Sequence, residues 1–280
     1  MAMRTVLQDL AFPEGPRWRQ GELFFSDMHA HEVVAMKPDG RRRTVFSHDR
    51  AVSGLGWLPD GRMLVVSMED RRLLRIEPDG KLVVHADLSS IADHHTNDMV
   101  VDANGRAYVG NFGFPLPGGK PKTTRMARVD PDGSVHVAAE ELMFPNGTVI
   151  TPDGRTLVVG ESFAGRLTAF DVAADGSLTN RRVWAQLPAP AAPDGICLDA
   201  EGAIWVASPT TNNVLRVREG GEVLARVEPD RGCYACMLGG EDRRTLFVLT
   251  AMTSEPAVCA QEMSGHIEAI EVDAPGAGLP

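Results

Sequence analysis

The segment FPNGTVITPDGRTLVVGES, residues 144–162, sets out the unit from which the whole chain is built. A short apolar run ends at the turn sequence TPDGR, and a second apolar run, TLVVGES, follows directly. Asp-Gly between two apolar runs predicts a β-hairpin, because glycine adopts the positive φ of the turn at little cost. The segment therefore predicts two antiparallel strands joined by a tight turn.

The same unit recurs along the chain. Each block predicts strand, Asp-Gly turn, strand, variable loop, strand, turn and strand, and convincing helical periodicity is absent. The PDG turn itself stands at 38–40, 59–61, 78–80, 131–133 and 152–154. The blocks begin near residues 14, 54, 97, 146, 194 and 235. Their spacing of roughly 40–50 residues, with four strands per unit, is typical of a β-propeller.

Six units predict an all-β protein, a six-bladed β-propeller with four antiparallel strands per blade. No interior linker interrupts the repeats, so we expect a single domain over residues 1–280. The first strand, MRTVLQ (3–8), precedes the first unit, and we expect it to complete the last blade. This N-terminal strand would close the ring and protect a sheet edge from further pairing.

Composition narrows the range of partners. The formal charge is −10 and the charges are interspersed, which argues against nucleic acid. No apolar run approaches the roughly 18 residues of a membrane helix, and the N-terminal stretch lacks the apolar core of a secretory signal. We therefore expect a cytoplasmic protein without membrane contact.

Four cysteines are too few for a disulfide scaffold. Cys233 and Cys236 form a lone CxxC, which we interpret as two small buried residues, while a pairing with Cys259 stays open.

Four of the predicted units begin with an oxygen-bearing side chain. The motifs FPEGP, TND, FPNG and PDGI place Glu14, Asn97, Asn146 and Asp194 at equivalent starts of innermost strands. In a propeller these positions surround the central channel. Two carboxylates and two carboxamides suit one hard divalent cation, Ca²⁺ first, with Mg²⁺ or Mn²⁺ possible and Zn²⁺ less natural. The alternative is that Asn-Gly and Asp-Gly are merely turns, but FPEG matches them with a glutamate that no turn requires.

The chain resembles the SMP-30/gluconolactonase/luciferin-regenerating enzyme family. The resemblance covers nearly the whole chain and is carried, in order and at blade spacing, by FPEGPRW, TNDMVVDANGRAYVGN, FPNGTVITPDGRTLVVGES and PDGICLDAEGAIWVAS. It implies a six-bladed propeller with one divalent metal in the central channel. It further implies Glu14, Asn146 and Asp194 as direct ligands and Asp194 as general base. Asn97 is then a substrate contact or an additional ligand.

Two departures from that family bear on the substrate. His95 stands where sugar-lactonase members carry an arginine, and the loop at 112–125 contains no acid where they carry a glutamate for sugar hydroxyls. We therefore expect a substrate less polar than an aldonolactone. His95, and His29 from the first blade's loop on the same face, are weaker candidate substrate contacts.

Three functions follow from this sequence. The first is a divalent-metal-dependent hydrolase, a lactonase that opens a lactone or related ester with water activated by Asp194. The second is a calcium-dependent phosphotriesterase-like or arylesterase hydrolase that uses the same site. The third is a non-catalytic binding scaffold whose metal is structural, since propellers host many functions. The expected partner is a small-molecule lactone or ester, and the sequence carries no signal for an oligomeric state.

Overall fold

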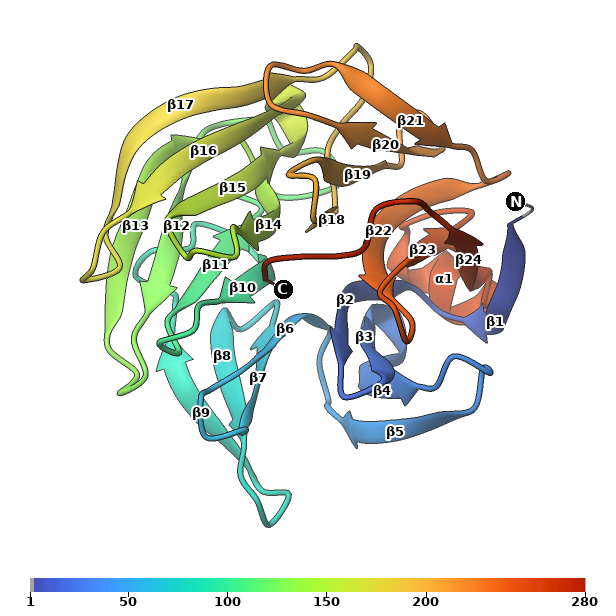
Figure 1. Ribbon diagram of the computed structural model, residues 1–280. Helices are drawn as coiled ribbons and strands as arrows, with labels where there is room; N and C mark the ends of the chain where they lie inside the picture. Colours follow the sequence, from blue (N-terminus) through green and yellow to red (C-terminus); the bar gives the residue numbers. More distant parts are fainter. Residues whose placement is uncertain (1–2, 280) are drawn as a thin grey trace.

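The computed structural model describes residues 3–279, and six four-stranded antiparallel sheets form a ring around a central channel (Figure 1). Each sheet is one blade, and the predicted six-bladed propeller is confirmed. Blades 1 to 3 consist of β2 (Pro13–Arg19), β3 (Glu22–Asp27), β4 (Glu32–Met36) and β5 (Arg42–Ser47); β6 (Val52–Trp57), β7 (Met63–Ser67), β8 (Arg72–Ile76) and β9 (Leu82–Asp87); and β10 (Thr96–Val101), β11 (Ala107–Asn111), β12 (Thr124–Val129) and β13 (Val135–Leu142). Blades 4 and 5 consist of β14 (Pro145–Ile150), β15 (Thr156–Glu161), β16 (Arg166–Val172) and β17 (Leu178–Gln186); and β18 (Ile196–Leu198), β19 (Ile204–Ser208), β20 (Asn213–Val217) and β21 (Val223–Val227).

Blade 6 joins the two ends of the chain. Its sheet order is β1-β24-β23-β22, so the N-terminal strand β1 (Arg4–Leu10) lies outside β24 (Gly265–Glu271), β23 (Thr245–Ala251) and β22 (Gly232–Gly239). The pairing of β1 with β24 is antiparallel, with Arg4 opposite Ala269 and Leu10 opposite Gly265. The predicted closure by the first strand is therefore confirmed. It holds the first and last blades together through backbone hydrogen bonds.

The inner strands are buried on both faces because neighbouring blades pack against each other. Strand β7 (MLVVS) and strand β19 (IWVAS) are buried at every position. A strand covered on both faces has a continuous run of apolar residues rather than alternating apolar and polar residues. The outermost strands face solvent, and β13 (VHVAAEEL) is mostly exposed or half-buried. The core is therefore a set of layers between blades, not a single central cluster.

Two glycines of the blade-start motifs are required by close packing near the channel. A Cβ on Gly147 would lie 2.4 Å from the Asp194 carbonyl oxygen, and one on Gly195 would lie 2.6 Å from the Ala235 Cβ. Neither glycine has a positive φ. The Asn-Gly and Asp-Gly pairs of FPNG and PDGI are therefore not turns of the PDG kind. Glycine stands there because adjacent inner strands come too close for a side chain.

One short helix, α1 (Pro256–Glu262), interrupts the β architecture. It lies in the long loop of blade 6 and packs against the short 3₁₀ helix η1 (Met28–Ala30) of blade 1; η2 (Ser162–Ala164) is a second such turn in blade 4. The sequence showed no helical periodicity there, because two turns are too short to display one. Pro256 begins the helix, where its missing N–H is no loss. Among residues 3–279, no helix has the length and apolarity to cross a membrane.

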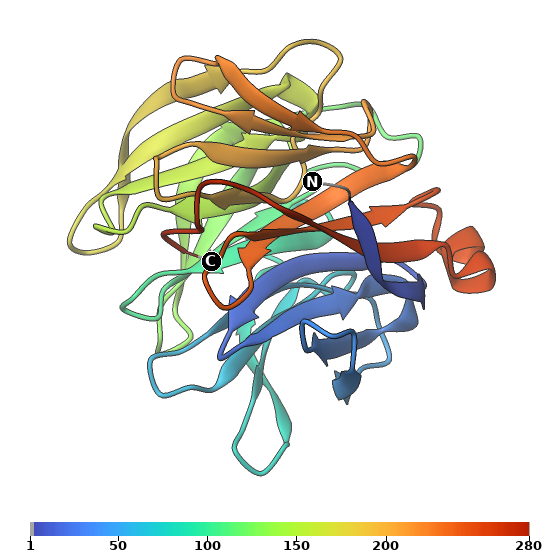
Figure 2. The same ribbon diagram turned by 45° about the vertical axis from the view of Figure 1, so that its right-hand side comes forward.

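The C-terminal segment crosses the channel on the face that carries the Asp-Gly turns (Figures 1 and 2). Leu279 exchanges backbone hydrogen bonds with Ile150 of blade 4, at 2.8 and 2.9 Å. The Ala277 N–H donates to the Leu198 carbonyl of blade 5 at 3.0 Å, and the Gly276 N–H donates to Arg243 of blade 6 at 2.9 Å. This strap links three blades and covers that end of the channel, opposite the long loops.

All four cysteines are buried and free. Cys233 and Cys236 lie in β22, as small buried residues, and neither is bonded to Cys259. Cys236 instead approaches Cys197 of the neighbouring blade, with the two sulfurs 3.8 Å apart. The interpretation of the CxxC pair as packing residues agrees with this burial.

Candidate functional site

The four oxygen-bearing residues predicted from the blade-start motifs meet at one end of the channel. Glu14 lies in β2, Asn97 in β10 and Asn146 in β14, while Asp194 immediately precedes β18. Each follows a loop that brings the chain from the outer edge of one blade to the inner strand of the next. Blades 1, 3, 4 and 5 thereby contribute one side chain each.

Hydrogen bonds connect the two carboxamides with neighbouring polar groups. The Asn97 Nδ2 donates to the Asn146 Oδ1 at 3.0 Å, and the Ser53 hydroxyl donates to the Asn97 Oδ1 at 3.2 Å. The Asn146 Nδ2 donates to the Ser162 Oγ at 3.2 Å. Asn146 also lies close enough to Asp194 to lower the pKa of that carboxyl group. This network holds both amide oxygens at the channel before any ligand binds.

The two carboxylates are desolvated and repel each other. Burial raises the pKa of Glu14 well above its usual value, and the charge of Asp194 adds to this rise, while a hydrogen bond from the Gly15 N–H opposes it. Asp194 retains part of its exposure, but desolvation raises its pKa to about 8 against the hydrogen bond from Asn146. Such a pair is costly without a compensating positive charge.

A third carboxylate beside them, Asp98, has its own partner. The Arg17 guanidinium lies 2.7 Å from the Asp98 carboxylate, and both side chains are buried. The same guanidinium donates to the carbonyl oxygens of Leu55 at 2.9 Å and Pro16 at 2.7 Å, and to that of Met99. Arg17 therefore neutralises Asp98 and supports the strand that carries Glu14. Within residues 3–279, neither of the other two carboxylates forms an ion pair with a lysine or arginine.

This donor set fits a divalent cation. Oxygen ligands of carboxylate and carboxamide type are those that Ca²⁺ and related hard cations prefer. In the described part of the chain, no three His, Cys, Asp or Glu side chains cluster as a ready-made metal site. The candidate set contains only two such residues, Glu14 and Asp194, so amide oxygens must supply the remaining protein ligands. The observation that favours a cation here is the burial of two carboxyl groups beside each other with, within residues 3–279, no lysine or arginine ion-paired to either.

The two histidines proposed as substrate contacts lie on different blades. His95 immediately precedes β10, two residues before Asn97, and its ring lies 5.7 Å from that of Phe112. His29 lies in η1 of blade 1, and its ring is 5.1 Å from that of Phe12. Desolvation lowers the pKa of His29 to about 4. Among residues 3–279, neither histidine hydrogen-bonds to the four oxygen-bearing side chains.

Tyr234 is a nearby residue that sequence reasoning missed. It lies in β22 of blade 6, and its ring stacks edge-on against Phe12 at 4.6 Å. Burial raises the pKa of its hydroxyl to about 12, and the nearby charges of Asp194 and Glu14 contribute to the rise. The motif alignment pointed to the next residue, Ala235, as the blade-6 equivalent, which hid the tyrosine. Asp98 was missed because its pairing with Arg17 joins two blades.

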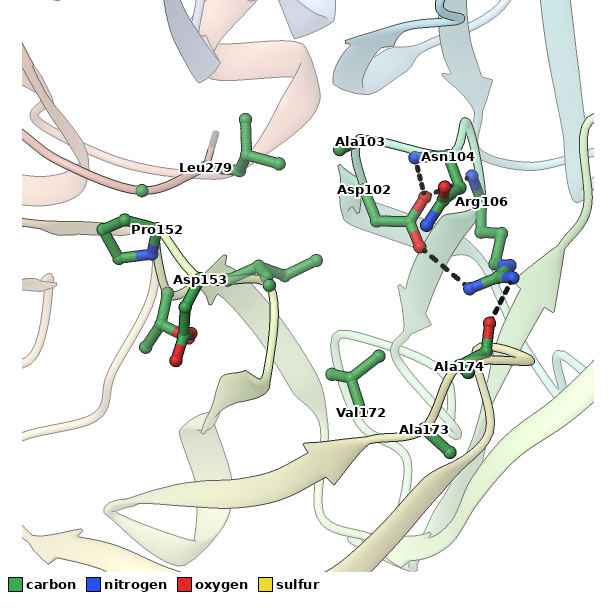
Figure 3. A pocket seen from close by; sticks show the side chains of 14 residues that line it. Asp102, Ala103, Asn104, Arg106, Pro152, Asp153, Val172, Ala173, Ala174 and Leu279 are labelled. Atoms are coloured by element: carbon green, nitrogen blue, oxygen red, sulfur yellow. Dashed lines mark hydrogen bonds and ion pairs between the residues drawn. The ribbon is translucent and has the colours of Figure 1, made fainter.

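A cavity of about 530 Å³ lies on the opposite face of the molecule (Figure 3). The turns after β10, β14 and β16 line it, together with Leu279. Its polar groups already have partners: Asp102 accepts from the backbone N–H of Arg106 at 2.8 Å, and the Arg106 side chain donates to the Ala174 carbonyl at 2.8 Å. None of the predicted site residues lines it. We interpret it as a crevice beside the C-terminal strap, remote from the carboxylate pair.

Comparisons with known proteins agree with this architecture. The family model of the SMP-30/gluconolactonase/LRE-like region matches residues 12–252. The pentonolactonase of Haloferax volcanii is 28% identical in an alignment 257 positions long, which covers 89% of this chain and 84% of that protein. The 6-deoxy-6-sulfogluconolactonase of Pseudomonas putida is 26% identical in an alignment 287 positions long, which covers 99% of this chain and 96% of that protein. The crystal structure of a calcium-binding protein, regucalcin from Agrobacterium tumefaciens, superposes with a TM-score of 0.83 at 22% identity, covering 100% of this chain and 96% of that one.

Proposed function

The chain belongs to the SMP-30/gluconolactonase/LRE-like family, and from this premise we propose that it is a divalent-metal-dependent lactonase, an enzyme that hydrolyses a lactone or related ester. Two relatives along most of its length are lactonases by name. The single observation that carries the proposal is the uncompensated pair of carboxylates, Glu14 and Asp194, beside two carboxamides at the channel.

The proposed cation ligands are Glu14, Asn146 and Asp194, with Asn97 as a further ligand or a substrate contact. Ca²⁺ is the first choice, because the set contains oxygen donors only, and Zn²⁺, Mn²⁺ or Mg²⁺ are alternatives. The name of the related regucalcin as a calcium-binding protein supports the same choice. When bound, the cation would polarise the lactone carbonyl and offset the negative charge that develops on its oxygen.

In this proposal, Asp194 transfers the proton and Asn97 orients the substrate. Asp194 accepts a proton from water while the water oxygen forms a bond to the carbonyl carbon. The bond between that carbon and the ring oxygen then breaks, and the proton passes to the ring oxygen to give the hydroxy acid. Asp194 is assigned this role because its carboxylate lies at the channel beside Glu14 and Asn146. Asn97, fixed by Ser53 and Asn146, orients the substrate.

The substrate we propose is less polar than an aldonolactone. His95 provides a ring in place of the arginine of sugar-lactonase relatives, and the loop at 112–125 has no acid to accept hydrogen bonds from sugar hydroxyls. The exposed Leu116 belongs to that loop. A surface of this composition favours apolar substituents on the lactone.

A panel of γ- and δ-lactones, aryl esters and phosphotriesters tests the proposal. Chelator-treated protein is assayed before and after addition of Ca²⁺, Zn²⁺, Mn²⁺ or Mg²⁺. We expect lactone hydrolysis that requires metal and that falls at least 100-fold in Asp194→Ala, since a general base contributes about 10²–10⁴-fold. Asp153→Asn, in an exposed turn on the opposite face, is the matched control.

Each competing function has its own result in that panel. Turnover confined to phosphotriesters or aryl esters would replace the lactonase with the second hydrolase class. No turnover by metal-replete protein, with the metal bound tightly, would favour the non-catalytic scaffold. Near wild-type rates in Asp194→Ala, with the fold verified, would refute the assignment of the base.

A further inference from the structure

Six aromatic rings gather beside the candidate site on the loop face, between blades 3 and 4. We call this cluster the aromatic ledge; its members are His94, His95, Phe112, Phe114, Phe144 and Phe163. Phe112 and Phe144 stack with ring centres 4.6 Å apart and planes inclined by 22°. Phe163 lies 5.0 Å from Phe114 and 5.3 Å from Phe144. The rings therefore form a continuous surface rather than isolated contacts.

The ledge is attached directly to the residues of the site. Phe144 stands two positions before Asn146 on the approach to β14. The Ser162 N–H donates to the Phe144 carbonyl at 3.1 Å, and the Ser162 hydroxyl accepts from Asn146. On blade 3, the Phe112 N–H donates to the carbonyl of His95, which stands two positions before Asn97, at 2.9 Å. A molecule bound at the two carboxamides therefore has this surface beside it.

The cluster has a buried base and an exposed top. Phe114 and Phe144 are 2% and 5% exposed, whereas Phe163 is 49% exposed. Phe144 has a φ of +59°, which is unfavourable for a bulky side chain. Such strain persists only where the surroundings hold it, and it concentrates at functional sites. Two buried rings thus support a third that is half exposed to solvent.

We propose that the aromatic ledge binds an aromatic ring carried by the substrate, so that the enzyme prefers aryl-substituted lactones. This inference rests on the proposed lactonase function and names its substrate class. Phenylalanine rings offer no partner to sugar hydroxyls but pack favourably against another ring, face to face or edge to face. Phe163 is the contact residue with the most free surface, and Phe112 and His95 extend the surface toward Asn97.

Matched ligands separate this inference from the function on which it rests. Turnover is compared for γ-phenyl-γ-butyrolactone and γ-butyrolactone, whose reacting esters are alike. Binding is measured by calorimetry for the corresponding lactams, 5-phenylpyrrolidin-2-one and pyrrolidin-2-one, which resist hydrolysis. We expect the phenyl compound to be favoured about 10-fold in both measurements, the size of a good aromatic contact.

Variants of the exposed ring then locate the preference. Phe163→Ala should remove most of the preference for the phenyl compound over the unsubstituted one, and Phe163→Leu should retain part of that preference. Val183→Ala, on the outer strand of the same blade, is the control and should change neither. Equal binding of the two lactams, or a preference that survives Phe163→Ala, would overturn the inference. Lactam discrimination without any lactone turnover would uphold the ledge and refute the lactonase.

Discussion

Replacing Arg17 by methionine should destabilise the propeller, because the Arg17 side chain of blade 1 forms hydrogen bonds with residues of blades 2 and 3. Arg17 is 4% exposed, and its guanidinium bonds to Asp98 of blade 3 and to the carbonyls of Leu55 and Met99. Methionine fills similar volume but provides neither the charge nor the donors. The variant therefore leaves a buried aspartate unpaired beside Glu14 and Asp194.

The expected loss can be estimated from these contacts. Removing one partner of a buried ion pair costs about 3–5 kcal/mol, because the other charge stays buried without compensation. The entropy of unfolding is about 2.1 cal/mol/K per residue, which for 280 residues gives about 0.6 kcal/mol/K. The melting temperature of Arg17→Met should therefore fall by about 5–8 °C. The melting temperature of Arg17→Lys should lie between those of the wild type and Arg17→Met, since lysine keeps the charge but not the planar set of donors.

A double-mutant cycle in urea, with chelator present, tests the origin of the loss. Adding Asp98→Asn to Arg17→Met should recover at least about 1 kcal/mol, because the unpaired charge is then gone. Asp98→Asn alone should be destabilising, since it leaves the guanidinium without its anion. A loss below about 1 kcal/mol in Arg17→Met, or no recovery in the double variant, would show that the ion pair is not what holds this region.

Three further changes probe the site and its supports. Glu14→Gln keeps the shape of the side chain but removes one of two anionic ligands, so calorimetry should find Ca²⁺ affinity at least about 100-fold weaker. The control Glu22→Gln should leave the affinity unchanged. An unchanged affinity in Glu14→Gln would contradict the ligand assignment. His29 has a folded pKa of about 4, below its unfolded value, so the unfolded state binds more protons between about pH 6.5 and 4 and stability falls as the pH falls through that range. Urea titrations at pH 7 and 4.5 measure this loss in the free energy of unfolding, and it should be about 2 kcal/mol smaller in His29→Gln than in the wild type. An equal loss in both proteins would refute the role of His29. Deleting residues 274–280 removes the strap's hydrogen bonds to blades 4 to 6 and should lower the free energy of unfolding by about 3 kcal/mol, whereas full stability would show that the strap only rests on the ring.

The fold was predictable because its signals are local and repeated. Each PDG turn predicts its own hairpin, and the same unit occurs six times, so one weak block does not change the result. The strand MRTVLQ, left over before the first block, predicted the closure of the ring, and its pairing with β24 confirms it. Helix α1 was not predicted, since seven residues inside a loop carry too little pattern.

The candidate site was predictable only as a set of positions. Equivalent motifs indicated that Glu14, Asn97, Asn146 and Asp194 begin inner strands, which follows from the repeat alone. The repeat does not tell which charges meet. Asp98 directly follows Asn97 and resembles another ligand in sequence, yet it is paired with Arg17, 81 positions away. Tyr234 lies close enough to Asp194 and Glu14 for their charges to raise its pKa, although the alignment of blades pointed to Ala235.

Local sequence, in short units of strand and turn, thus determined the number of blades, the closure of the ring and the residues around its axis. Their chemistry was decided by packing between blades. Tertiary contacts neutralise Asp98, bury the Glu14 and Asp194 carboxyl groups beside each other, and assemble four phenylalanines from three loops into one surface. The physical reason is that hairpins form from neighbours in sequence, whereas desolvation, charge pairing and ring stacking depend on side chains that only the closed ring brings together.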